Sequence, residues 1–574
     1  MYKFKKKKKW QKALIGIVVS ISVLLLAFFA LVIGLTVKDS IDIKNSTREK
    51  VAVEETTTSV YEQLIQNPIP SGKDDLVDEN TTPVPIQMSD KKLAEFEKYI
   101  SGIIVDYDYE KGYNIDAALA EYNNNTKSTV TKHSHDIRLN GEFNAEHFYE
   151  IVKKNNEAFF EEKEKDSLGG LYKEYSNKEL KSMCEQFCET LPAIAEKDPT
   201  VDLDMVCCYL YNLRIVQKSG SLDFGGFDMN NRFYLNYKNM KNGAFAMDTD
   251  DIEQTTFYHE MMHAFQFACD DVKKTDEDRM GITHTYDSLE VNPLSWYWLL
   301  EGSAEMNMSQ YLGVRYSTYK NKIGYIHSLN IVANLNSNNK YVQIEKICFQ
   351  RDLEKFFEVL DITDENDKKE IIKMMYSIEI IQESKDDFYD WYNETYNANL
   401  SDETNGEQSV LRLTLKEDAL MTLTKLFYRN LARQINKRNV TLQDAYYLMR
   451  LYEADLDNHF SNNTVGYMEF FHDFYDTYVD LQNEFFAVIA EENNLSADDL
   501  ANGFDNYSMN AVSKSPNCDL KFLSSDAKNY YTVEYIDRYY MKGYPSMRSC
   551  QKQTAELNKK YPFDKSKINQ ILNY

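Results

Sequence analysis

The stretch at residues 255–266, TTFYHEMMHAFQ, constrains the fold most, because it sets two histidines into an apolar segment. His259 and His263 are four residues apart, so in a helix both side chains lie on one face and can reach one metal ion. Two buried imidazoles are costly unless a partner satisfies them. The stretch therefore predicts a buried helix that holds a metal ion, with a hydrogen-bonded structural histidine pair as the alternative.

The motif H-E-x-x-H also supplies chemistry, because Glu260 directly follows the first histidine. A carboxylate there can take a proton from a water molecule on the metal, so the motif provides two zinc ligands and a general base. A catalytic zinc site needs a third protein ligand and one open position. The metzincin pattern does not provide it, since Gln266 and Cys269 stand where that pattern requires a glycine and a third histidine.

A second motif, EGSAE at residues 301–305, predicts the third ligand. Asn292 and Pro293 upstream are typical of a helix start, with proline in the first turn. Glu301 and Glu305 then lie on one helical face, where one carboxylate can bind the metal and the other can hydrogen-bond a ligand histidine. The alternative for this pair is a solvated helix face, which the apolar residues before Glu301 argue against.

With these two motifs the chain resembles the gluzincin metallopeptidases, in which H-E-x-x-H is followed on a later helix by a glutamate ligand, often in a W-x-x-E-G-x-A-E-like setting. The resemblance covers a small part of the chain and implies zinc bound by His259, His263 and Glu301. Glu260 would act as the general base, and Glu305 would hydrogen-bond a ligand histidine. The helical C-terminal part of such enzymes often steadies the oxyanion, and the histidines open for that role are His327, His459 and His472.

The spacing between the two motifs departs from that family. In its best-known members the glutamate ligand follows within about twenty residues of the first motif, whereas Glu301 lies 38 residues after His263. An insertion must therefore separate the two helices, and it contains other possible ligands. We favour Glu301 because a helical EGSAE motif is more specific than isolated polar residues, and His284 ranks next. The remaining alternatives are Glu277, Asp287 and Glu290.

The N-terminus predicts a membrane anchor. Residues 1–12 contain seven lysines and no acidic residue, and residues 13–37 are 25 uncharged, mostly apolar residues. A helix of that length measures about 37 Å, enough to cross a hydrocarbon core of about 30 Å. A cleavable signal peptide is the alternative, but its apolar core is shorter and ends in a small-residue cleavage site. The lysines favour a cytoplasmic N-terminus, so we expect a single-pass protein of the cell membrane with an extracellular C-terminal part.

Composition divides the rest of the chain. Residues 38–90 are polar and contain four prolines, which is typical of a flexible stalk. Beyond it we expect a mainly α (α+β) fold: a helical N-terminal region at 91–218, a zincin-like catalytic core with a small sheet at 219–325, and a helical C-terminal region at 326–574. Alternation at 232–238 predicts a strand, which by the resemblance would pair with an extended peptide substrate. A loop is expected at 219–226, and helices at Glu146–Phe160, Asn177–Ile194, Val201–Val216, Lys346–Val359, Asp367–Ser384, Leu411–Asn436, Leu442–Leu456 and Val465–Glu491.

The charge excludes one class of partner. The net charge is −26, and the first 37 residues carry +7, which leaves −33 on the remainder. Such a surface repels nucleic acid. We therefore expect a membrane-anchored, extracytoplasmic zinc metallopeptidase whose substrate is a peptide or protein, with no oligomeric state indicated. The alternative is a catalytically inactive zincin-like protein that serves as a surface binding or scaffold protein.

Eight cysteines permit disulfides in an exported chain, although a chain of this size does not need them. A second zinc site among the first four cysteines is disfavoured, because their C-x3-C…C-C spacing is poor for tetrahedral ligation. The possible pairs are Cys184 or Cys188 with Cys207 or Cys208, and Cys518 with Cys550.

Overall fold

The structure is a computed structural model that describes parts of the chain between residues 82 and 555. The predicted basic tail at 1–12, the membrane anchor at 13–37 and the stalk up to residue 81 lie outside the described residues. None of the described helices is both long and apolar enough to cross a membrane. The described residues are 82–105, 137–139, 142–163, 172–197, 201, 203–218, 225–228, 232–236, 252–268, 277–280, 283–286, 297–312, 320–336, 342–349, 353–382, 405–461, 472–507, 546–549, 551–552 and 555.

The described residues are mainly helical and carry small sheets, which confirms the mainly α expectation. The helices are α3 (Asp90–Gly102), α5 (Ala145–Lys163), α6 (Asn177–Lys197), α7 (Leu203–Tyr211), α8 (Ile252–Gln266), α9 (Tyr297–Leu312), α10 (Lys320–Asn336), α11 (Ile344–Ile347), α12 (Leu353–Val359), α13 (Glu365–Gln382), α15 (Asn405–Lys437), α16 (Leu442–Ser461), α17 (His472–Asn493) and α18 (Ala497–Asn506). The strands are β1 (Pro85–Ile86), β2 (Arg138–Leu139), β3 (Glu142–Phe143), β4 (Tyr172–Lys173), β5 (Arg214–Lys218), β6 (Gly225–Asp228), β7 (Arg232–Asn236), β8 (Phe267–Ala268), β9 (Glu277–Met280), β10 (Thr283–Tyr286) and β11 (Val440–Thr441).

Two apolar cores divide these elements. The larger core joins α3 to α10, α13 and the long helices α15, α16 and α17. The second core joins α5, α6 and α7 to the four-stranded sheet and α8. Helix α9 belongs to both, because Leu299 and Met306 pack into the larger core and Ala304 and Met308 into the second. Burial on all sides explains why the sequence of α9 shows no clear polar face.

The four-stranded sheet has the order β4-β5-β7-β6, with β5 and β7 parallel and the other pairs antiparallel. The strand expected at 232–238 is present as β7, but it lies inside the sheet. The expectation that this strand pairs with a substrate is therefore wrong, because β7 is already paired on both sides. Among the described strands, β6 forms the edge of the sheet next to β7, and β4 forms the opposite edge. The helix expected at Val201–Val216 ends at Tyr211, because the β-branched residues that follow pair with β7 as strand β5.

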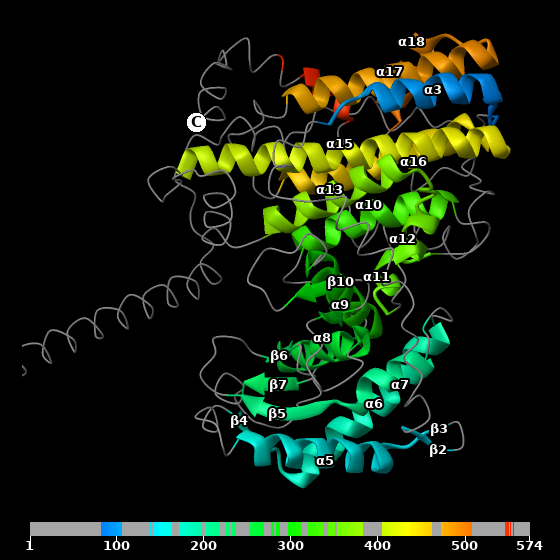
Figure 1. The fold of residues 1–574 in the computed structure, drawn as a ribbon. Coiled ribbons are helices and arrows are strands. Elements are labelled where there is room, and N and C mark those ends of the chain that lie inside the picture. Colours follow the sequence, from blue (N-terminus) through cyan, green and yellow to red (C-terminus); the bar gives the residue numbers. More distant parts are fainter. Residues whose placement is uncertain are drawn as a thin grey trace, which may run out of the picture. The chain divides into compact units, whose positions relative to one another are not determined.

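The first described segment packs against helices from the end of the chain (Figure 1). Strand β1 pairs with β11, and α3 lies beside α15 and α17, where the ring centroid of Phe96 is 5.7 Å from that of Phe485. Ile86 and Met88 are only 1% and 3% exposed. The predicted stalk boundary at residue 90 is therefore too late, and α3 packs with the C-terminal helices instead of the elements that follow it in sequence.

Helix α13 begins and ends within two residues of its expected range, whereas α15 begins six residues before its expected start and α16 ends five residues after its expected end. The structure describes α17 from His472 onward, and the expected helix Lys346–Val359 contains two helices, α11 and α12. In the core of the C-terminal helices, Arg450 Nη1 lies 2.6 Å from Glu453 Oε2 in a buried ion pair. Gln482 Nε2 and the Met547 backbone amide donate to the other carboxylate oxygen at 2.8 and 3.3 Å. A buried ion pair requires such a set of partners, and here it also fixes residue 547 to the helices.

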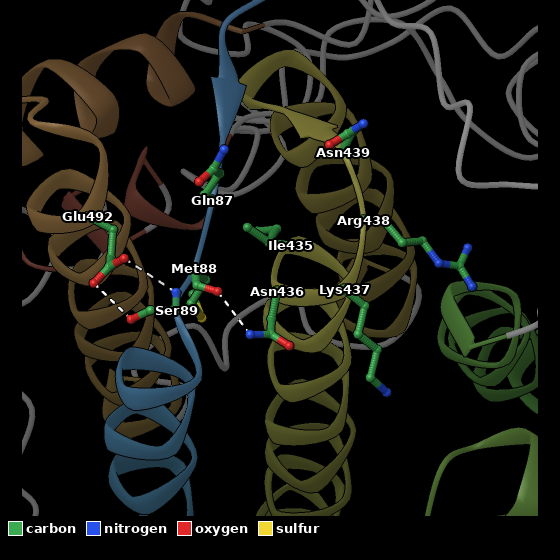
Figure 2. Close-up of a pocket in the computed structure, with 9 residues that line it drawn as sticks. All are labelled: Gln87, Met88, Ser89, Ile435, Asn436, Lys437, Arg438, Asn439 and Glu492. Atoms are coloured by element: carbon green, nitrogen blue, oxygen red, sulfur yellow. Dashed lines mark hydrogen bonds between the residues drawn. The ribbon is translucent and has the colours of Figure 1, made fainter.

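A surface pocket of about 350 Å³ lies where the first segment meets the end of α15 (Figure 2). None of the candidate site histidines and glutamates lines this pocket. Most of the residues that line it are polar. Asn436 Nδ2 donates to the Met88 carbonyl at 2.9 Å, and Ser89 Oγ donates to Glu492 at 3.0 Å. These polar groups bond to one another across the pocket, so we assign it to the junction of α3, α15 and α17.

The cysteines whose side chains are described do not form the expected pairs. Cys184, Cys188 and Cys348 are free thiols, and Cys207 forms no disulfide. Burial raises the pKa of Cys188 to about 12 and that of Cys184 well above its ordinary value, so both are held as neutral thiols. The other members of the proposed pairs have side chains outside the described residues: Cys208, Cys518 and Cys550.

Candidate metal centre

Helices α8 and α9 bring two histidines and two glutamates together inside the protein. His259 and His263 lie one turn apart on α8, and Glu301 and Glu305 lie one turn apart on α9. The exposed fractions of these residues, in the same order, are 6%, 4%, 6% and 4%. Polar groups buried this deeply require partners, and each helix supplies them to the other.

Contacts on its other faces hold α8 in place. The ring of Phe257 lies edge-on to the rings of Phe187 and Phe233, with centroid separations of 6.0 and 5.3 Å. Tyr258 Oη donates a 2.6 Å hydrogen bond to Gln186 on α6. The apolar residues of the H-E-x-x-H segment thus anchor the helix to the second core, and its histidines occupy the face toward α9.

The ligand groups of three residues converge at this face. His259 Nε2 lies 3.2 Å from Glu301 Oε2, and His263 Nε2 lies 3.2 Å from His259 Nε2 and 3.4 Å from Glu301 Oε1. Ligand atoms at about 2.0–2.1 Å from a tetrahedral zinc ion lie about 3.3–3.4 Å from one another. Each separation is close to that value, with one oxygen of Glu301 facing each histidine, and one ligand atom from each of the three residues lies within 4.8 Å of the others. This buried group could therefore hold a metal ion.

The outer nitrogens of the two imidazoles differ in their partners. His259 Nδ1 lies 3.1 Å from Glu305 Oε2, a contact that fixes the ring and leaves Nε2 for a ligand. His263 Nδ1 is buried and has no hydrogen-bond partner among the described residues. The Nε2 atoms of the two rings face each other, an arrangement that a shared proton or a cation satisfies.

The carboxylates and imidazoles also shift one another's protonation. Burial by itself lowers the pKa of His259, but the hydrogen bonds that its ring donates to Glu301 and Glu305 outweigh burial and raise that pKa to about 10. Burial by itself raises the pKa of Glu301, but the charge of His263 and the hydrogen bonds of both histidines hold it well below its ordinary value. A proton therefore binds strongly at the place where a metal ion would bind, and the two compete.

Glu260 lies at the exposed side of the group. Its side chain is partly accessible, whereas the ligand side chains are buried. Desolvation raises the pKa of its carboxyl, and the charges of His259 and His263 and a hydrogen bond from the Phe227 backbone oppose that rise only in part. A partly accessible carboxylate with a raised pKa next to the histidines suits a group that accepts and returns a proton.

Strand β6 reaches this side of the site because it begins with glycine. A Cβ at Gly225 would lie 2.8 Å from Cγ2 of Thr256 on α8 and 3.0 Å from Cδ2 of Leu235. The absence of a side chain thus lets the strand approach the helix and brings Phe227 to Glu260. The loop expected at 219–226 overlaps the first two residues of β6, and the Gly225-Gly226 pair is the sequence signal for a close approach of the backbone to the helix.

Among the side chains that the structure describes, Glu301 groups with the two histidines. The main alternative, His284, lies in β10, and its side chain is outside what the structure describes. The same holds for Glu277 in β9, while Asp287 and Glu290 lie outside the described residues altogether.

The histidines considered for oxyanion stabilisation gain no support. His327 is 3% exposed on α10, and burial lowers its pKa to about 3, so it is neutral. His459 and His472 have side chains outside the described residues.

No protein-family model, curated protein or solved structure matches this chain. The site is therefore interpreted from its own geometry and chemistry.

Proposed function

We propose that this protein is a zinc-dependent peptidase of the gluzincin type, with a zincin-like core in which His259, His263 and Glu301 bind the metal. The observation that carries the proposal is the set of 3.2–3.4 Å separations among the imidazole nitrogens and carboxylate oxygens of these three buried residues. Glu305 supports it through its contact with His259 Nδ1, because metal-binding histidines almost always donate their other nitrogen to such a group.

Zinc bound here would supply Lewis acidity, lowering the pKa of a bound water toward about 7 and polarising a substrate carbonyl. The chain's own residues would do the rest. Glu260, at the accessible side of the ligand group, would accept the proton of the attacking water and return it to the leaving amine. Burial of the ligands among apolar side chains would keep other water away and strengthen each electrostatic interaction.

Strand β6 is the element we propose for peptide binding. It lies at the edge of the four-stranded sheet, and the Phe227 backbone contacts Glu260, so a strand added along β6 would pass the general base. An extended peptide can add to an exposed sheet edge through main-chain hydrogen bonds. This position supports a peptide or a protein segment as the proposed substrate class, without fixing the side chains that are recognised.

We further propose that residues 13–37 anchor the protein in the cell membrane, with the lysine-rich N-terminus in the cytoplasm and the metal site outside. The support is the run of 25 uncharged, mostly apolar residues behind seven lysines. The remaining part would be held near the membrane surface by the polar segment that follows.

The decisive test compares bound zinc with peptide cleavage in the purified protein. Wild type should contain one zinc ion per chain and cleave members of a peptide library. Glu260→Gln should keep its zinc, since the residue is no ligand, and should lose about 10²- to 10⁴-fold in hydrolysis rate. Glu301→Ala should lose both zinc and activity, because it removes one of three protein ligands.

His284→Ala is the matched control, because His284 was the next candidate for the third ligand, and it should keep its zinc. Zinc loss in that variant with retention in Glu301→Ala would reassign the ligand. Stoichiometric zinc without cleavage of any peptide would favour the inactive binding or scaffold protein, and a wild type without zinc would refute the metal site.

A further inference from the structure

We propose that Glu379 is a positioning residue for the metal centre. It lies on the neighbouring helix α13 and holds the first turn of α9, and so it fixes the position of the Glu301 carboxylate relative to the two histidines. The proposal rests on the proposed metal site. It assigns a role to a residue of the C-terminal helices that no motif in the sequence indicates.

The contact lies at the start of α9. Helix α9 begins at Tyr297, and the amides of a helix's first turn have no acceptor within the helix. Glu379 Oε2 accepts the Trp298 amide at 3.1 Å, and Glu379 is only 3% exposed. A carboxylate at this end of a helix also interacts favourably with the helix dipole, so the bond is stronger than one between neutral groups.

A second bond fixes the same residue of α9. The indole Nε1 of Trp298 donates to the Met375 carbonyl at 3.0 Å, and the side chain is fully buried against Tyr325. Met375 and Glu379 lie one turn apart on α13. Two bonds from one helix therefore fix both the backbone and the side chain of Trp298, which leaves the first turn of α9 little freedom to slide or rotate.

Glu301 follows Trp298 by three residues, so it lies about 4.5 Å further along the helix axis. A metal centre tolerates ligand displacements of only a few tenths of an ångström before coordination suffers. A shift of the first turn is thus transmitted directly to the ligand carboxylate, while the histidines on α8 stay where the second core holds them.

The far end of α9 has its own attachment. Asn307 Nδ2 donates to the Glu345 carbonyl at 3.3 Å, and Gln310 Nε2 donates to the Glu345 carboxylate at 3.0 Å. Loss of the Glu379 bond should therefore leave α9 folded and packed, with its ligand turn displaced. This separates a positioning role from a purely structural one.

The experiment measures zinc affinity by chelator competition and the visible absorption spectrum of the cobalt-substituted protein. Glu379→Ala should weaken zinc binding about 10-fold, the low end of the range for groups that orient ligands, and should shift the cobalt bands, which report ligand geometry. Glu379→Gln keeps an acceptor oxygen without the charge and should fall between Glu379→Ala and wild type.

The matched control is Glu370→Ala on the same helix, because Glu370 pairs with Lys425 on α15 at 2.6 Å and not with α9. It should leave zinc affinity and the cobalt spectrum at wild-type values, whatever it does to thermal stability.

Wild-type zinc affinity and spectrum in Glu379→Ala would overturn the positioning role while the proposed function stands. Equal weakening in Glu379→Ala and Glu370→Ala would also overturn it, because the effect would then be general. If Glu379→Ala does not fold, Glu379→Gln decides by the same two measurements. A wild type that binds no zinc would refute both proposals.

Discussion

His259 shows how much one side chain of this protein has to do. One ring nitrogen faces Glu305, and the other faces both Glu301 and His263. The spacing of four residues in H-E-x-x-H and in E-G-S-A-E predicted these neighbours, because helical geometry alone brings such residues to one face. The side chain that holds the ligand helix, Glu379, could not be predicted, since it lies 78 residues beyond Glu301 with no motif around it.

A second histidine should make the protein sensitive to acid. Burial lowers the pKa of His327 to about 3 from an ordinary value of 6.5. The unfolded chain therefore takes up a proton below about pH 6.5 that the folded protein resists, so stability falls as the pH is lowered from there toward 3, by up to about 1.4 kcal/mol per pH unit.

His327→Gln should remove this component of the pH dependence. Measured as unfolding free energy against pH, wild type should lose more stability than the variant between pH 6.5 and 3. His147→Gln, which removes a partly exposed histidine on α5, should follow wild type. Parallel curves for wild type and His327→Gln would contradict the prediction.

Among the helices and strands, those set by a local sequence pattern could be predicted, and those set by tertiary contacts could not. The long helices were predictable because their apolar residues recur at helical spacing over many turns. The segment at 214–218 was not, because a short apolar run fits a helix or a buried strand equally well, and its pairing with β7 decides. The edge strand β6 was missed for a related reason: its glycines carry no apolar pattern at all.

The pairing of β6 with β7 depends on one of those glycines. Gly226 lies opposite Tyr234, and a Cβ at Gly226 would come within 2.9 Å of Cε1 of that ring and closer still to its outer atoms. The ring is held by burial and by Lys218 Nζ, 4.2 Å from its centroid. Gly226→Ala should therefore destabilise the protein by about 1–3 kcal/mol through overpacking.

Denaturant unfolding of Gly226→Ala, Tyr234→Ala and the double variant provides the measurement. The double variant should be destabilised by at least about 1 kcal/mol less than the sum of the single variants, because the overlap needs both partners. Gly102→Ala is the control, since nothing lies within 4 Å of a Cβ there, and it should change stability by no more than about 0.5 kcal/mol. Additive single effects would refute the overlap.

For the whole molecule, the sequence indicated a helical C-terminal region but not what it encloses. Ile86, Met88 and Phe96 complete its core from the other end of the described chain. No local pattern predicts such a partner, because β1 is only two residues long and pairs more than 350 residues further on. The order of regions along the sequence therefore differs from their grouping in space.

The proposed anchor makes a prediction at this scale. The full chain should sediment with membranes and resist alkaline carbonate extraction, because a span of residues 13–37 is held by the hydrocarbon core and not by surface charge. A variant lacking residues 1–37 should be recovered in the soluble fraction, since it keeps β1 and α3 and with them the complete larger core. Membrane association that persists in this variant would refute the anchor.

The pairing of β1 with β11 has a consequence for biosynthesis. Ribosomes add about 5–20 residues per second, so roughly 20–70 s separate the synthesis of the two strands. During that interval the backbone of β1 and the apolar face of α3 have no native neighbour, because α15 and α17 do not yet exist. Closure of the larger core must therefore be one of the last steps of folding, and the nascent chain should depend on chaperones until helix α17 has emerged.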